Sequence, residues 1–175
     1  FNTLIAKAER EIKYVDSEIR NGIIYSKNEK IPYNGLIKDY YKNGNVKIEW
    51  TIVNGAQNGV AKSYYEDGTL KSDSIFKNNK KTGIEKMYSF DGKLVAEVPY
   101  KDEVRDGIEK QYSKNGKIII EIGFKNGIED GVRKNFYENG NLKYSIEMKN
   151  GVENGAFKQY YENGILEIEA FYKNG

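Results

Sequence analysis

Polar and apolar side chains alternate along much of the chain. Residues 142–149, for example, switch strictly between apolar or aromatic side chains and polar ones. A period of two predicts a β-strand with one face wetter than the other. A shorter, tyrosine-rich arm precedes each such stretch, as at 36–41, and an Asn-Gly or Asp-Gly dipeptide separates the two arms. That dipeptide accepts the positive φ of a tight turn, so the pattern predicts β-hairpins.

Glycine recurs with a period of 24 residues in two series that never slip. The first series opens each unit and the second, nine residues later, falls in the predicted turn; the two series are Gly35, Gly59, Gly83, Gly107, Gly131 and Gly155, then Gly44, Gly68, Gly92, Gly116, Gly140 and Gly164. A third series consists of Gly55, Gly127, Gly151 and Gly175, with Asn79 and Glu103 in its remaining places. Such regular spacing indicates a backbone requirement at turns rather than a compositional bias.

Other positions repeat in step with the glycines. Counted from the first glycine, position +3 is always lysine, +5 always aromatic, and +11 always aliphatic. The sequence therefore predicts an all-β chain of six hairpins forming one elongated, twisted antiparallel sheet, a solenoid of about twelve strands.

The hairpin register stays open at this point. A two-residue turn would place the lysines opposite an acidic position on the second arm, whereas a three-residue turn with a glycine bulge would place them opposite apolar residues. The first arrangement is electrostatically more favourable, because opposite charges would face each other across the strand pair.

Residues 1–32 do not follow the repeat and are expected to form an N-terminal cap of helix or strand, with the repeats at 33–175. Leu4, Ile5, Ala8 and Ile12 would line one face of a short helix, and 23–25 would form a capping strand. We expect Trp50 to pack against this cap. The alternating segment Ile165–Tyr172 is expected to leave an exposed edge that could mediate self-association.

Composition and charge exclude several classes of function. Twenty-eight basic and 26 acidic residues give a net charge of +2, so nucleic acid is not an expected partner. Histidine and cysteine are absent, which excludes Cys/His zinc sites, thiol nucleophiles and Ser-His-Asp triads. Carboxylate pairs fall near turns, and no phosphate-binding or calcium loop is present. We therefore expect no enzyme activity, no metal and no cofactor.

No apolar run approaches the length of a transmembrane helix. The segment Ala6-Lys7-Ala8 fits the end of a signal peptide, which favours a secreted or cell-surface location, with the cytoplasm as the alternative.

Tyrosine rows are the candidate binding face. Adjacent strand residues point to opposite sides of a sheet, so one ring of each Tyr-Tyr pair would be exposed. The candidate row is Tyr41, Tyr65, Tyr137 and Tyr161, or alternatively the row of Tyr40, Tyr64 and Tyr160. Either row would suit a protein or a glycan, while packing between neighbouring strands is the simpler explanation.

The unit G-x-x-K-x-Y-Y-x-N-G-x-L-K-x-E resembles the bacterial variant of the MORN repeat. It occurs at 35–49, with Val46 in place of the leucine, and again at 155–169, with Glu167 in place of the second lysine. The resemblance covers 33–175 and implies hairpins stacked into an elongated sheet. Proteins built of this repeat are commonly labelled as antitoxin components of toxin–antitoxin systems, and others are secreted or surface proteins. The resemblance therefore implies one of these roles. The expected function is a non-enzymatic module that binds a protein, with binding of glycan, cell envelope or a host surface as the alternative.

Overall fold

The computed structural model describes residues 10–175, and this part of the chain is built of β-strands with one short 3-10 helix, η1 (Tyr14–Asp16). No α-helix occurs among residues 10–175. The all-β prediction is therefore confirmed. The chain forms two compact units that divide between Lys80 and Lys81, and each is described separately below.

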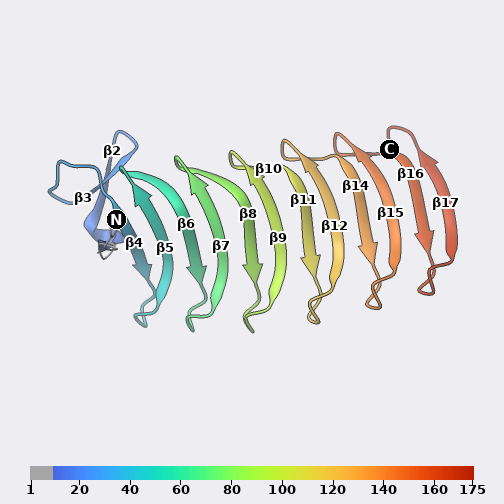
Figure 1. The fold of residues 1–175 in the computed structure, drawn as a ribbon, viewed down its shortest axis with the longest axis horizontal. Coiled ribbons are helices and arrows are strands. Elements are labelled where there is room, and N and C mark those ends of the chain that lie inside the picture. Colours follow the sequence, from blue (N-terminus) through green and yellow to red (C-terminus); the bar gives the residue numbers. More distant parts are fainter. Residues whose placement is uncertain (1–9) are drawn as a thin grey trace, which may run out of the picture. The chain divides into compact units, whose positions relative to one another are not determined.

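Unit 1 contains the N-terminal segment and the first two repeats. Its sheet runs in the order β1-β4-β5-β6-β7, with β1 parallel to β4 and every other neighbour antiparallel; β2 and β3 form a separate hairpin (Figure 1). The strands are β1 (Glu11–Lys13), β2 (Ser17–Arg20), β3 (Ile23–Ser26), β4 (Gly35–Tyr40), β5 (Val46–Val53), β6 (Ala56–Tyr64) and β7 (Leu70–Lys77).

Unit 2 contains four repeats whose strands follow one another in the sheet as they do in sequence. The order is β8-β9-β11-β12-β14-β15-β16-β17, and the short strands β10 and β13 extend the connections by pairing with β9 and β12. Within this unit the tight hairpin turns lie along one edge and the connections between repeats along the other (Figure 1). The strands are β8 (Lys80–Tyr88), β9 (Leu94–Lys101), β10 (Val104–Arg105), β11 (Gly107–Tyr112), β12 (Ile118–Lys125), β13 (Ile128–Glu129), β14 (Gly131–Phe136), β15 (Leu142–Lys149), β16 (Val152–Tyr160) and β17 (Leu166–Tyr172).

The hairpin turn combines features of both registers that the sequence left open. In the first repeat, Gly44 N–H donates to Tyr41 O (3.0 Å) and Tyr41 N–H donates to Asn45 O (2.8 Å), which is a three-residue turn with a glycine bulge. Gly44 has a φ of +89°, which this bulge requires. One residue later a second bulge leaves Lys47 without a partner on the facing strand.

The second bulge decides which side chains face each other. It shifts the register by one residue, so Lys38 lies opposite Glu49 rather than opposite an apolar residue. The same shift occurs in the other five hairpins, at 63–64, 87–88, 111–112, 135–136 and 159–160. Every lysine of this position except Lys134, which lies opposite Ser145, therefore faces an acidic residue although the turn itself is the longer one.

The N-terminal segment covers part of the sheet of unit 1 as strands. Ile12, which was predicted on a helical face, lies in β1 beside Ile37 and packs against the core cluster, so the helix prediction is wrong at this residue. Pairing with β4 satisfies the backbone of β1, and this outweighs the weak helical pattern of a short segment. Leu4, Ile5, Ala8 and the Ala6-Lys7-Ala8 segment lie outside the described residues. Residues 23–25 do form a strand, β3.

The core of unit 1 is small. Tyr33, Ile37 and Ile52 are almost fully buried, with Ile24 and Trp50 packed against them. The ring of Trp50 lies 5.7 Å from that of Tyr14, between ring centroids, which confirms that this residue packs against the N-terminal cap.

Fewer apolar residues are buried in unit 2, and one of its buried residues is charged. Val98 and Ile146 are buried, as is the carboxylate of Glu109. Glu109 pairs with Arg105 at 3.2 Å, and the Arg105 guanidinium stacks on Phe124 at 5.1 Å from the ring centroid. Stability in such a thin sheet comes from contacts between neighbouring strands.

Candidate binding faces of the repeat sheet

Strand alternation gives each unit two chemically different faces. One face, here called the lysine face, carries the lysine at position +3 of every repeat, the aromatic residue at +5 and the residue at +14, which is acidic except for Ser145 in the fifth repeat. In unit 1 the opposite face carries Ile37, Trp50 and Ile52 and is partly covered by η1, β2 and β3. The lysine face, which the cap does not cover, is therefore a candidate binding surface.

Lysines and acids form a ladder across neighbouring repeats on this face. Lys62 Nζ lies 3.8 Å from Glu49 and Lys134 Nζ lies 3.5 Å from Glu121, in each case an acid of the preceding repeat. These pairs are partly exposed, so each adds little to stability, but together they fix charge positions. The ladder therefore gives this face alternating charge rather than a basic groove.

Glu11 continues the ladder at the N-terminal end. No repeat precedes β4 in unit 1; instead β1 runs beside it, and Glu11 accepts hydrogen bonds from Lys38 Nζ (2.8 Å) and Tyr40 Oη (3.2 Å). The hydrogen bond from Lys38 lowers the pKa of the Glu11 carboxyl. Glu11 thus occupies the place that the acid of a preceding repeat takes elsewhere in the sheet.

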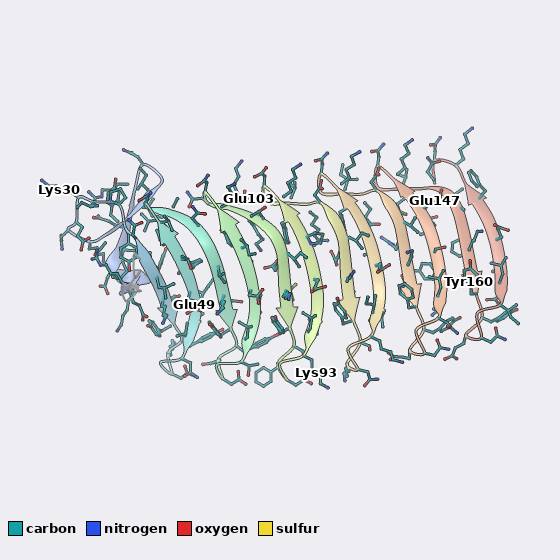
Figure 2. All side chains as sticks on the ribbon, in the orientation of Figure 1. Lys30, Glu49, Lys93, Glu103, Glu147 and Tyr160 are labelled. Carbon is teal, nitrogen blue, oxygen red and sulfur yellow. The ribbon has the colours of Figure 1, made fainter. Side chains whose placement is uncertain are left out.

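The first tyrosine row lies on the lysine face and is tied into the ladder. Tyr64 Oη donates to Glu49 at 2.8 Å and Tyr112 Oη donates to Glu97 at 2.7 Å. Burial, reinforced by the acceptor carboxylate, raises the pKa of each of these tyrosines to about 12. Tyr40, Tyr64 and Tyr160 are all half-buried, and the last is marked on β16 in Figure 2.

The second tyrosine row also connects neighbouring repeats. Tyr41 Oη donates to Tyr64 O (2.8 Å) and Tyr137 Oη donates to Tyr160 O (2.7 Å). Tyr65 is half-buried beneath Lys71, whose Nζ lies 5.6 Å from the ring centroid, while Tyr161 is 50% exposed. These contacts give both rows a packing role, and a binding role for them stays a prediction.

An exposed aliphatic row crosses the lysine face on its other half, towards the connections between repeats. It is formed by position +1 of the repeat, and in unit 2 its members are Ile84, Ile108 and Val132, exposed by 49%, 59% and 42%. In unit 1, Val60 and its cross-strand partner Ile75 are each 46% exposed. Position +1 is aliphatic in all six repeats, and this periodicity is the sequence signal that indicates the row.

Gly123 creates a groove within the row in unit 2. Its position lies opposite Ile108 and is occupied by a larger residue in each of the other repeats. The resulting groove has a volume of about 350 Å³, with Ile108 and Val132 among its apolar lining residues and Glu121 and Lys134 among its charged ones. Its size suits one or two side chains of a partner.

Neither a metal centre nor a membrane-spanning helix is evident in the described part of the chain. Residues 10–175 contain no cluster of three or more Asp or Glu side chains placed to hold a metal ion. They also contain no helix long and apolar enough to cross a membrane.

Comparison with known proteins identifies the repeat. The family model described as "MORN repeat variant" matches six segments, at residues 33–54, 57–78, 81–102, 105–126, 129–150 and 153–174. No curated protein matches the chain.

Two solved structures show distant similarity. One is an S. aureus TarM mutant in complex with fondaparinux, alpha-GlcNAc-glycerol and UDP, at 13% identity and a TM-score of 0.40, covering 55% of this chain and 19% of the other. The second is the GtfA/B complex bound to UDP and GlcNAc, at 10% identity and a TM-score of 0.31, covering 67% of this chain and 23% of the other. This chain thus spans less than a quarter of either protein.

Proposed function

Because the chain belongs to the MORN repeat variant family, we propose that it is a non-enzymatic module that binds a protein partner through the aliphatic row of unit 2. The repeats are consistent with a module that binds other molecules. An antitoxin-like component is one form of this function, in which the bound protein would be a toxin.

The observation that carries the proposal is the exposure of Ile84, Ile108 and Val132 on successive first arms. Single exposed apolar residues are ordinary, but aligned aliphatic side chains beside an apolar groove are typical of an interaction surface. Burying them against a partner would gain about 25 cal/mol for each square ångström removed from water.

The surroundings of the row have the layout of a protein interface. The groove over Gly123 can receive an apolar anchor side chain, while the lysine–acid ladder beside it supplies a polar rim. The alternating charge of the ladder suits a partner with mixed charge rather than a polyanion.

Affinity capture with the native chain tests the proposal. Lysate and envelope fractions would be passed over the immobilised chain, and the retained proteins identified by mass spectrometry. The test variant is Ile108→Ser/Val132→Ser. The matched control is Ile128→Ser/Val152→Ser, since these residues lie in the same unit, at the connection edge, with exposures of 51% and 46%.

We expect one stoichiometric partner that is lost with the test variant and retained with the control. Loss only with a variant that truncates Tyr41, Tyr65, Tyr137 and Tyr161 would place the site on the second tyrosine row instead. Capture of no protein by the native chain would contradict the proposal and favour a glycan or envelope ligand.

A further inference from the structure

A cavity lies in unit 1 between the N-terminal cap and the sheet. Its volume is about 220 Å³, and its walls come from η1, β2 and β3 on one side and from β4, β5 and β6 on the other. Within unit 1 the cavity lies on the face opposite the lysine face, which carries Val60.

Backbone hydrogen bonds anchor the cap to the sheet beside the cavity. Ile24 N–H donates to Gly55 O, Tyr33 N–H donates to Ile24 O, and Gly55 N–H donates to Tyr33 O, all at 2.9 Å. The space for a side chain at Gly55 is already filled by Ile23, whose Cγ2 lies 2.3 Å from the position of a Cβ. Because these contacts fix β3 on the sheet, the cavity exists before any ligand binds.

The lining is mostly apolar and aromatic, with Ser17 and Gln57 as its polar residues. Ile37 and Ile52 form a floor that is 98% buried, and Trp50 lies beside the ring of Tyr14. Tyr14 and Ile19 are more than half exposed, which opens the cavity to solvent at its rim. None of the described residues that line the cavity is charged, so a charged ligand would lose its hydration without a compensating partner among them.

One polar group in the lining lacks a partner. Gln57 Nε2 is buried, and none of the described residues accepts a hydrogen bond from it. The Gln57 backbone cannot move away, because its N–H donates to Asn79 Oδ1 (2.6 Å) and its carbonyl accepts from Asn79 N–H (2.9 Å). A buried donor without a partner is costly, and an acceptor brought by a ligand would remove that cost.

We propose that this cavity binds a small uncharged ligand that has one ring and one hydrogen-bond acceptor. The ring packs against Trp50 and the isoleucines, and the acceptor oxygen receives a hydrogen bond from Gln57 Nε2. The size matches, since an apolar cavity of about 150 Å³ accommodates benzene and the additional volume admits a short substituent.

Trp50 provides a direct readout because it is the only tryptophan in the chain. The full chain would be titrated with acetophenone and with α-methylstyrene, which has the same shape but replaces the carbonyl oxygen by CH2. The position of the Trp50 indole N–H resonance in a nitrogen–proton correlation spectrum reports occupancy of the cavity.

We expect saturable shifts with both compounds and an affinity for acetophenone about five- to tenfold higher, the size of one net hydrogen bond. Gln57→Leu should abolish this difference while binding of α-methylstyrene persists. Gln159→Leu, at a glutamine that donates to Glu167 in unit 2, is the matched control and should keep the preference.

Three results would overturn the proposal. The first is the absence of a saturable shift with either compound. The second is an unchanged preference for acetophenone in Gln57→Leu, and the third is equal affinities for the two compounds in the native chain. Ser17→Phe, which fills the cavity from β2, should block binding, and circular dichroism would verify its sheet content.

Discussion

The hydroxyl of Tyr64 donates a 2.8 Å hydrogen bond to Glu49, which lies in the preceding repeat. This contact joins two repeats through side chains, in addition to the backbone bonds between their strands. Tyr112 and Glu97 form the same contact in unit 2 at 2.7 Å. These tyrosines therefore help to hold neighbouring repeats together.

This contact predicts that Tyr64 and Tyr112 lose their hydroxyl protons at a higher pH than ordinary tyrosines. The pKa values of Tyr64 and Tyr112 are raised to about 12, so the folded state keeps both protons after the unfolded state has released them near pH 10. Stability should consequently fall between about pH 10 and pH 12. Tyrosinate absorbance against pH measures the titration, and denaturation midpoints at both ends of the window measure stability.

The assignment can be checked with single variants. Tyr64→Phe should remove one late-titrating group, and Glu49→Gln should lower the pKa of Tyr64 while leaving that of Tyr112 unchanged. An unchanged late titration in Tyr64→Phe would show that the hydrogen bond in solution differs from the one described.

Glu11 is predicted to anchor β1 in a pH-dependent way. Its pKa is lowered by the hydrogen bond from Lys38, so its contribution is complete above the ordinary value of 4.5 and is lost as the pH falls through the lowered value. The contribution should be below about 1 kcal/mol, because the pair is partly exposed.

Hydrogen exchange at the Leu36 amide measures this anchoring, since that N–H donates to Arg10 O at 2.7 Å. Glu11→Gln should accelerate its exchange at neutral pH and flatten the pH dependence. Glu18→Gln, which removes a carboxylate from the separate β2–β3 hairpin, should leave it unchanged.

Gly35→Ala is predicted to be much more destabilising than Gly44→Ala. Both glycines have positive φ, but a Cβ at Gly35 would lie 2.0 Å from Arg10 O, whereas Gly44 has open space around it. Gly44→Ala should cost about 1–2 kcal/mol for the backbone conformation alone. Gly35→Ala should add the free-energy cost of displacing β1. Similar unfolding free energies for the two variants in denaturant titrations would contradict the close packing at Gly35.

The Arg105–Glu109 pair predicts that removing the arginine alone lowers stability more than replacing both residues. Arg105→Met leaves the buried Glu109 carboxylate without its cation and should destabilise the chain by about 1–3 kcal/mol. Adding Glu109→Leu should recover most of that loss, because apolar replacements of a buried pair are often neutral. Denaturant titration of both variants measures the effect; a double variant less stable than Arg105→Met would show that the charges themselves are needed.

Some features of the candidate faces could be predicted from sequence and others could not. The tyrosine rows follow from periodicity, but their hydroxyl partners, such as Tyr64 O for Tyr41, lie 23 residues away and depend on how repeats stack. The aliphatic row has a sequence signal in the aliphatic residue at position +1 of each repeat, but its exposure depends on whether another segment covers that face. Gln57 gives no sequence signal, since its lack of a partner depends on what surrounds it.

The sequence by itself determined the repeat, the hairpins and the residues at their turns, because glycine and asparagine at fixed spacing dictate local backbone conformation. It also determined which side chains share a face within each arm, since strand alternation is a local property. Tertiary structure decided the register, where the second bulge at Lys47 restores the facing of Lys38 and Glu49. It also decided that Ile12 lies in a strand beside β4 and that a cavity remains under the cap. These outcomes depend on hydrogen bonds and packing between segments distant in sequence, which no local pattern specifies.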